Sequence, residues 1–370
     1  MERTDFITTL ITNDEIVSSL IPENGKFFNV PDLPAYADKV NSLGKALVIR
    51  DSSNELKSYV LYYDNSGQVF ITMVWTNSNF RGKGYAATLL KHLIASSAKD
   101  ILLEVHPENP AKLLYHKLKF KFERLNGSNE ILKFTKLLAV NQPYFFPYIG
   151  YFQLLYSADI FIFYDDVNFI KQGWINRNQI LVGQQTMVFT VPLQNQSSFS
   201  KIKNTKINRI LYAKWCQKFI KTIEQNYKKA PFYEAVSALV FEVLKTEHDS
   251  ISDLAIDSVV QVFAYLGVDF KYEKSSCLSP NFIDFERSDR LIAIAKGKGY
   301  KNYINPIGGQ ALYNKKYFEE NGVNLFFLKP VLSNYERFDG DFTSGLSIID
   351  VLMFNSKEAV VRMISEYKII

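Results

Sequence analysis

The sequence predicts an α/β protein with two domains, and three observations support this. The chain has 370 residues, more than one typical small domain contains. In residues 1–136 the apolar pattern switches between strand and helix spacing, in the order strand, strand, strand, helix, strand, helix, strand, strand. From residue 137 a second series begins, with buried strands and long helices. We expect a mixed sheet with flanking helices in residues 1–136 and a larger α/β domain in residues 137–370.

The composition is that of an ordinary globular protein with a mild positive charge. Hydrophobic residues make up 47% of the chain, charged residues 22%, and the net charge is +5. There is no dense basic run, so we expect no nucleic-acid partner; phosphorylated metabolites or CoA suffice to explain the charge. Cys216 and Cys277 lack metal-ligand spacing, which predicts no metal site and a reduced, cytoplasmic location. The polar start and the absence of a long apolar window predict no signal peptide and no membrane insertion.

The first domain opens with a helix and three strands. Apolar spacing predicts a helix over residues 6–20, with Thr12 or Asn13 as its N-cap. Turn-forming residues then separate antiparallel strands, and two more strands complete the sheet after the central helices. These strands are expected at residues 45–50, 57–63, 68–75, 120–124 and 130–136.

A glycine-rich loop, Arg81–Ala86, lies between a β-rich segment and a helix that continues through Ile94. Such a loop points unpaired backbone N–H groups of a helix N-terminus at a ligand, which suits a phosphate. A tight turn without a ligand is the alternative. Tyr85 after Gly84 excludes the Walker pattern, and Ala87 excludes the dinucleotide fingerprint. The remaining pattern is Arg/Gln-x-x-Gly-x-Gly/Ala.

That pattern resembles the pyrophosphate loop of the GCN5-related N-acetyltransferase (GNAT) superfamily, over about residues 1–136. The resemblance implies an acetyl-CoA-dependent N-acetyltransferase in which backbone N–H groups near Val74 polarise the thioester carbonyl. The cofactor-binding residues expected from it are Met73, Val74, Phe80, Arg81, Gly82, Lys83, Gly84, Tyr85, Ala86, Asn109 and Lys112.

A second element supports the resemblance. A strand at 101–106, a turn at 107–110 and a short helix at 111–118 place Asn109 and Leu114-Tyr115 where the family often has them, although Lys119 replaces the usual Gly before Phe120. By analogy Tyr115 would protonate the leaving thiolate, a task that suits a phenol; a packed core aromatic is the alternative. Glu104 and His106 alternate onto one strand face, and either could take a proton from the attacking ammonium.

The second domain follows without a linker, since Leu137–Val140 already has the character of a strand. The chain then turns, and a helix is expected from about Gly150. The apolar run 158–164 predicts a buried strand that ends in paired carboxylates. A dense polar group follows it, and we interpret this group as a ligand site at the carboxyl end of a sheet, with mutually satisfied salt bridges as the alternative. Its residues are Asp165, Asp166, Lys171, Trp174, Asn176, Arg177 and Asn178.

These residues resemble the WbqC-like family, together with Gln142-Pro143, Tyr303 with Gly308-Gly309, and Leu346–Asp350. The resemblance covers about residues 137–370. That family is associated with O-antigen and other surface-polysaccharide gene sets, and it adds Asn141, Gln142 and Tyr303 to the expected second-domain ligand residues. Many members have His where this chain has Asn141, and Asn cannot act as a general base near neutral pH.

Later segments of the second domain read as helices. Apolar spacing predicts them at residues 208–225, 233–246 and 250–265, where we expect them to cover the sheet. Lys296–Tyr300 repeats four letters of the first glycine loop, but it follows a helix and precedes a strand. Gly297 or Gly299 is therefore expected to be a helix C-cap.

The leading hypothesis is acetyl transfer from acetyl-CoA to a primary amine of an amino sugar, carried on a nucleotide, in surface-glycan biosynthesis. Two alternatives remain open at this stage. The second domain could run a separate acyl or aminoacyl transfer, or it could be a non-catalytic module that binds a sugar nucleotide. The sequence does not predict the oligomeric state.

Overall fold

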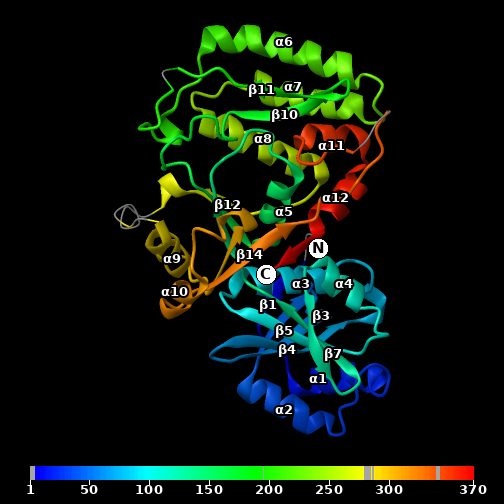
Figure 1. Ribbon diagram of the computed structural model, residues 1–370. Coiled ribbons are helices and arrows are strands. Elements are labelled where there is room, and N and C mark those ends of the chain that lie inside the picture. The colour runs from blue at the N-terminus through cyan, green and yellow to red at the C-terminus, as the bar shows by residue number, and fades with distance from the viewer. Residues whose placement is uncertain (1–4, 195, 279–284, 286, 339–341) are drawn as a thin grey trace. The chain divides into compact units, whose positions relative to one another are not determined.

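The computed structural model describes residues 5–194, 196–278, 285, 287–338 and 342–370. The chain folds as two compact units, Met1–Lys136 and Leu137–Ile370 (Figure 1). Both are mixed α/β structures, as predicted.

The N-terminal unit is built on a seven-stranded sheet of order β1-β2-β3-β4-β5-β7-β6. Strands β4 and β5 are parallel, and the other neighbouring pairs are antiparallel. The strands are β1 Phe6–Thr8, β2 Lys45–Arg50, β3 Leu56–Asp64, β4 Gln68–Thr76, β5 Asp100–Val105, β6 Lys121–Asn126 and β7 Asn129–Phe134. The helices are α1 Asn13–Leu20, η1 Ile21–Glu23, α2 Leu33–Leu43, η2 Ser78–Phe80, α3 Tyr85–Ser96 and α4 Lys112–Lys117.

Helices cover both faces of this sheet. One core packs α3 and α4 against Val60, Ile71 and Leu103, while the other packs α1 and α2 against Val48, Tyr59 and Leu61. Side chains of a strand alternate between faces, so neighbouring residues of β3 such as Tyr59 and Val60 feed different cores. The prediction of one helix over residues 6–20 was wrong in its first part, because residues 6–8 pair with β2 as a strand. Helix α2 was not predicted.

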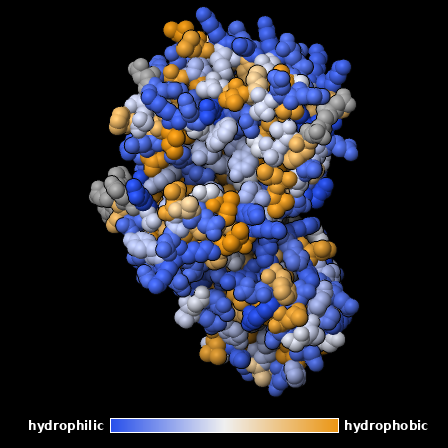
Figure 2. Space-filling model, viewed as in Figure 1, coloured by the Kyte–Doolittle hydropathy of each residue, from blue (hydrophilic) through white to orange (hydrophobic). Residues whose placement is uncertain are grey.

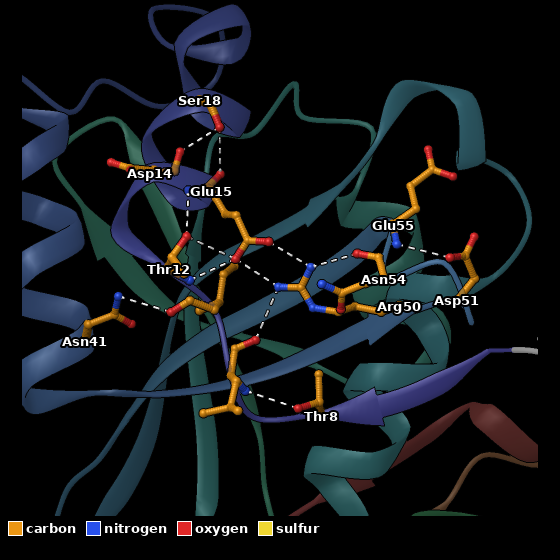
Figure 3. A network of polar contacts seen from close by, with 12 residues as sticks. Thr8, Thr12, Asp14, Glu15, Ser18, Asn41, Arg50, Asp51, Asn54 and Glu55 are labelled. Atoms are coloured by element: carbon orange, nitrogen blue, oxygen red, sulfur yellow. Dashed lines mark hydrogen bonds and ion pairs between the residues drawn. The ribbon is translucent and has the colours of Figure 1, made fainter.

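A polar network fixes α1 to the end of β2 (Figure 3). Thr12 caps α1 in a reciprocal capping box with Glu15, which confirms one of the two expected caps. The Glu15 carboxylate also accepts a 2.8 Å hydrogen bond from the buried Arg50 and forms a 2.7 Å ion-pair contact with it. Arg50 donates further to the Asn54 carbonyl. Because α1 is attached in this way, the position at which the following residues 21–28 begin is fixed.

The C-terminal unit contains a six-stranded sheet of order β12-β9-β8-β13-β14-β15, parallel except for β15. A separate hairpin pairs β10 with β11. The strands are β8 Leu138–Asn141, β9 Ile160–Phe163, β10 Arg177–Val182, β11 Gln185–Thr190, β12 Tyr272–Lys274, β13 Asn302–Pro306, β14 Asn324–Pro330 and β15 Tyr367–Ile369. The helices are α5 Ile149–Ser157, η3 Ile202–Asn204, α6 Arg209–Tyr227, α7 Tyr233–Lys245, α8 Ile251–Leu266, η4 Ser275–Cys277, α9 Arg287–Gly297, η6 Ile307–Gly309, α10 Lys315–Glu320, α11 Ile348–Phe354 and α12 Lys357–Ser365.

Its sheet is also covered on both faces. Helices α9 and α10 pack on one face, and α5, α8 and α12 belong to the core on the other (Figure 1). The three long helices predicted from spacing exist as α6, α7 and α8. However, α6 packs against the β10–β11 hairpin, where Phe219 contacts Phe189 with ring centroids 4.6 Å apart, so only part of the predicted helical cover reaches the sheet. The helix before the second glycine pair ends at Gly297, and Gly299 has φ +75°, as expected of a C-cap.

The apolar residues are mostly gathered into these cores. On the face shown in Figure 2, hydrophobic residues form small groups among hydrophilic ones. Among the described residues no helix is both long and apolar enough to cross a membrane.

Candidate functional site

The glycine loop of the N-terminal unit forms an open helix N-terminus. Gly84 is the N-cap of α3 and has φ +84°, and Gly82 has φ +79°, a backbone region that side chains other than glycine rarely adopt. Because Gly84 has no side chain, it cannot accept a hydrogen bond from the backbone N–H groups of the first turn of α3. Apart from the surrounding backbone of the loop itself, no heavy atom of the described residues lies within 4 Å of the position that a Cβ would take at either glycine. The loop therefore fits a pyrophosphate.

The loop borders a cavity of about 750 Å³ that opens where two parallel strands separate. The pairing of β4 with β5 runs only from Gln68↔Asp100 to Ile71↔Leu103. The register of β3 with β4 also shifts beside Thr72, between the pairs Leu61↔Met73 and Tyr62↔Ile71. Both strand ends line the cavity. Strand β4 contributes residues 71–76, and β5 with the residue after it contributes residues 103–106.

Most of the expected cofactor residues line this cavity. They are Met73, Val74, Phe80, Arg81, Gly82, Gly84, Tyr85, Ala86 and Asn109. Asn109 also fixes the start of α4, since its Oδ1 accepts a hydrogen bond from the Ala111 N–H. Two expected lysines lie elsewhere. Lys112 forms a 2.8 Å ion pair with Glu130 of β7, and Lys83 lies over the Phe80 ring, outside the lining.

Arg81 has a partner that the sequence did not indicate. Its guanidinium donates a 2.6 Å hydrogen bond to Glu23 of η1 and another to the Thr76 carbonyl. The Arg81 hydrogen bond lowers the pKa of Glu23, with a smaller effect from Lys26. Glu23, Lys26, Phe27 and Phe28 all line the cavity. The only sequence signal for this segment was the Phe27-Phe28 pair among polar residues, and it fitted no motif.

Tyr115 lines the same cavity and is also part of the core. It is 7% exposed, and its ring lies 6.0 Å from that of Phe120. Burial raises the pKa of Tyr115 to about 12. The phenol is therefore protonated at neutral pH and can donate a proton but cannot act as a base.

Glu104 and His106 both line the cavity. Glu104 is exposed and accepts hydrogen bonds from the side-chain amides of Asn126 and Asn129, at 3.1 and 2.8 Å. His106 Nδ1 accepts from the Glu108 N–H, and its ring lies against Phe27. The cavity therefore brings the glycine loop together with Tyr115, Glu104 and His106.

The C-terminal unit has its own cavity, of about 690 Å³, at the carboxyl ends of its parallel strands. The chain passes from β8 to β9 on one side of the sheet and later adds β13 on the other side of β8. Ligands of open α/β sheets commonly bind where the strand order reverses in this way. Residues directly after β8 and β13 line the cavity, as that rule requires.

The structure divides the polar group that the sequence suggested as one site. Asn141, Gln142, Trp174 and Tyr303 line the cavity, whereas Asp165, Asp166, Lys171, Asn176, Arg177 and Asn178 do not. Asp165 and Asp166 are buried and accept hydrogen bonds from Ser275, and Asp166 also forms a 2.6 Å ion pair with Arg290 of α9. These carboxylates fasten the end of β9 to neighbouring elements, so the salt-bridge interpretation fits them.

The remaining polar residues brace the backbone. Asn176 donates to the Val191 carbonyl, and Asn178 donates to the Phe146 carbonyl at 2.9 Å. The Arg177 guanidinium donates to the carbonyls of Gly173 and Gln172 and lies 5.5 Å from the Trp174 ring centroid. Lys171 is exposed.

The cavity also contains residues that the sequence analysis did not select. Asn305, at the end of β13, and five tyrosines complete much of its lining. Those tyrosines are Tyr144, Tyr148, Tyr151, Tyr164 and Tyr313. Asn305 lies between Tyr303 and Gly308-Gly309, which belong to the family motifs, so the end of this strand was the sequence signal that could have identified it.

Two family models match separate parts of the chain: that of the acetyltransferase (GNAT) family at residues 13–120, and that of the WbqC-like protein family at residues 142–362. The "Uncharacterized protein Rv1507c" of Mycobacterium tuberculosis is 27% identical over 231 residues, which is 60% of this chain and 96% of that protein.

Solved structures align with the N-terminal unit. Arabidopsis thaliana NAA60 in complex with acetyl-CoA is 16% identical, with a TM-score of 0.29, over 35% of this chain and 98% of its own. The ribosomal-protein-S18-alanine N-acetyltransferase from Escherichia coli is 17% identical, with a TM-score of 0.29, over 35% of this chain and 90% of its own. We infer nothing about function from similarities with such low TM-scores and sequence identities.

The match at residues 13–120 confirms the predicted N-acetyltransferase and, with it, acetyl-CoA as the cofactor. The match at residues 142–362 covers more than half of the chain. The chain therefore belongs to the WbqC-like protein family, and its N-terminal unit is an acetyltransferase domain of the GNAT family.

Proposed function

We propose that this acetyltransferase acts on the primary amine of an amino sugar, carried on a nucleotide, during the assembly of a surface polysaccharide such as O-antigen. The observation that supports acetyl transfer best is that one cavity contains both the open N-terminus of α3 and the Tyr115 phenol. The choice of an amino sugar rests on the WbqC-like unit in the same chain, because that family is associated with polysaccharide gene sets.

The chain's own groups suffice for the proton transfers of amide formation. Acetyl-CoA supplies the acetyl thioester, and Arg81–Ala86 would hold its pyrophosphate. Glu104 or His106 would accept the proton that the attacking ammonium must lose, and Tyr115 would donate a proton to the leaving thiolate. Backbone N–H groups near Val74 would polarise the carbonyl. Glu23, whose pKa is lowered by Arg81 and Lys26, stays ionised at neutral pH and would hold the Arg81 guanidinium beside the loop.

The rival assignment, acyl or aminoacyl transfer by the second unit through Asp165, Asp166, Lys171 and Arg177, receives no support from their contacts. Three of the four side chains are bonded within the protein, and none of the four lines the cavity.

The test is an acceptor screen with the full chain and acetyl-CoA. Free thiol release and product mass would be measured with nucleotide-linked amino sugars, with spermidine and with a peptide that has a free N-terminus. We expect an amino-sugar nucleotide to be acetylated and Arg81→Ala to lower its turnover. If spermidine or the peptide were acetylated and no amino-sugar nucleotide were, the protein would still be an acetyltransferase, but the proposed sugar acceptor would be refuted.

A further inference from the structure

The cavity of the C-terminal unit differs from that of the N-terminal unit in charge. No Asp, Glu, Lys, Arg or His belongs to the lining formed by the described residues, whereas the first cavity is lined by Glu23, Lys26, Arg81, Glu104, His106 and Lys117. Burying an anion or a cation without a countercharge is costly. The second cavity therefore suits an uncharged ligand.

Asn305 is the polar group most clearly available to such a ligand. Its side chain lines the cavity and is only 7% exposed, yet within the described part of the chain it forms no hydrogen bond. Gly309 makes room for it, since a Cβ there would lie 2.3 Å from Asn305 Nδ2. The Asn305 amide is not among the fully enclosed side-chain groups of the described residues that lack a partner, so it is accessible from the cavity, where a ligand with a hydroxyl or amide group could bond to it.

Further neutral hydrogen-bonding groups converge from the neighbouring strand β8 and the segment after it. Asn141 Oδ1 accepts a hydrogen bond from the backbone N–H of Gln142. Among the described residues, Asn141 Nδ2 and the side-chain amide of Gln142 form no hydrogen bond. The same holds for the hydroxyls of Tyr144 and Tyr148. Burial raises the pKa of both tyrosines, so they remain neutral donors and acceptors.

Aromatic rings supply the apolar part of the lining. Trp174 is 42% exposed although it is a large hydrophobic residue, and Arg177 lies over its ring. Aromatic rings with polar edges suit a ligand that has one apolar face and several hydroxyl groups. A pyranose ring has that character, and the volume is within the usual range for small-molecule sites.

We propose that this cavity binds the uncharged ring of a sugar, and an N-acetylated amino sugar in preference to the free amino sugar. A free amino sugar carries an ammonium group at neutral pH, for which the described lining offers no carboxylate. The acetamido group is neutral and can pair with the Asn305 amide through its N–H and C=O groups. The preference deepens the proposed function, on which it rests, because it assigns the acetylated sugar ring of the product, without its charged nucleotide, to the second unit. The binding itself does not depend on acetyl transfer.

The test is a calorimetric titration of the full chain with two pairs of sugars: N-acetylglucosamine with glucosamine, and N-acetylgalactosamine with galactosamine. Uridine diphosphate and N-acetylglucosamine linked to it serve as charged probes. We expect an N-acetylated sugar to bind at least tenfold more tightly than its free amine, with no gain from the diphosphate. Asn305→Leu should weaken binding by about tenfold, the effect of losing one or two buried hydrogen bonds.

Three further variants secure the interpretation. Trp174→Ala, at the exposed rim, should weaken binding several-fold without affecting the fold. Asn226→Leu removes a half-buried amide of α6 whose hydrogen bond, within the described part of the chain, is to Thr222 of the same helix, and it should not change binding. Arg81→Ala should lose acetyl-CoA binding and keep sugar binding, so that failure of the two proposals can be told apart. The proposal is refuted if no N-acetylated sugar binds at millimolar concentration, if free amines bind equally well, or if uridine diphosphate alone competes for the site.

Discussion

Tyr115 shows how one side chain can contribute to packing and remain available for chemistry. Its ring belongs to the core beneath α3, which keeps it 7% exposed, and its residue still lines the cavity. The same burial that secures the ring disfavours the phenolate and raises the pKa of Tyr115 to about 12. Packing thus maintains the protonated form that a proton donor needs.

Tyr115→Phe removes only the hydroxyl and tests this role. We expect kcat to fall by about 100-fold, as for loss of a general acid, while the Kd for acetyl-CoA changes little. Because the pKa is raised, the wild-type rate should not decline through this group between about pH 7 and about pH 10, the ordinary pKa of tyrosine. Steady-state kinetics over that range provide the measurement.

Tyr59→Phe is the matched control. Tyr59 is buried in the other core of the same unit, where its hydroxyl bonds to Ser19. That variant should lower stability and leave kcat intact. An unchanged kcat in Tyr115→Phe would show that Tyr115 only packs.

At the residue scale, the sequence predicted the first cavity better than the second. The glycine loop needs particular residue types at fixed spacing, so its pattern is local and readable. Asp165 and Asp166 looked equally promising, but their partners Ser275 and Arg290 are more than 100 residues away, and only the fold brings them together. Asn305 could not be selected from its local sequence. What marks it as a site residue is its place at the end of β13, where the strand order of the sheet reverses.

At the element scale, the attachment of α1 to β2 determines where residues 21–28 begin to line the cavity. The attachment rests on Glu15 and Arg50, which lie 35 residues apart in the sequence and form two short contacts (Figure 3). Arg50 is buried, so removal of its partner leaves a charge poorly compensated.

Glu15→Gln should lower the free energy of unfolding by about 1–3 kcal/mol at pH 7. The Arg50 hydrogen bond is the largest cause that lowers the pKa of Glu15 from its ordinary value of 4.5. The folded state therefore favours the ionised form, and the stabilisation is present above pH 4.5 and lost as the pH falls through the lower folded-state pKa. Denaturant titrations at several pH values should show the difference from wild type shrinking in acid.

Glu55→Gln is the control for this change, since the Glu55 side chain is exposed in the same network region (Figure 3). Its stability should match wild type at every pH. A Glu15→Gln deficit that persists unchanged at low pH would contradict the ion-pair explanation.

At the scale of the whole molecule, each unit has its own sheet, cores and cavity. Strands β2 to β7 of the first unit and the long helices of the second could be predicted because their periodicity is strong, whereas β1 was predicted as helix. Helix α2 and the layer formed by α6 with the hairpin could not, since the first lacks a motif and the second depends on contacts between distant segments.

Asp166→Asn tests whether the two units function separately. Arg290 would lose its carboxylate partner, and because its Nε already lacks a partner among the described residues, we expect a loss of about 3–5 kcal/mol in the second unit. Thermal denaturation should show this loss, while acetyl-CoA affinity below the transition stays at the wild-type value. Asp289→Asn, on the exposed side of α9, should change neither property. If the folded Asp166→Asn protein no longer bound acetyl-CoA, the claim that the two units function separately would be contradicted.

The central claim is that the loop at Gly84 holds the cofactor of an acetyltransferase, and a calorimetric titration with acetyl-CoA tests it most directly. Gly84→Glu forces a side chain onto a backbone with φ +84° and adds a negative charge at the helix N-terminus. Gly127→Glu adds the same charge at φ +60° in the turn between β6 and β7, at a residue that is not part of the cavity lining. Wild type and Gly127→Glu should bind acetyl-CoA and Gly84→Glu should not; equal affinity of all three proteins would contradict the account.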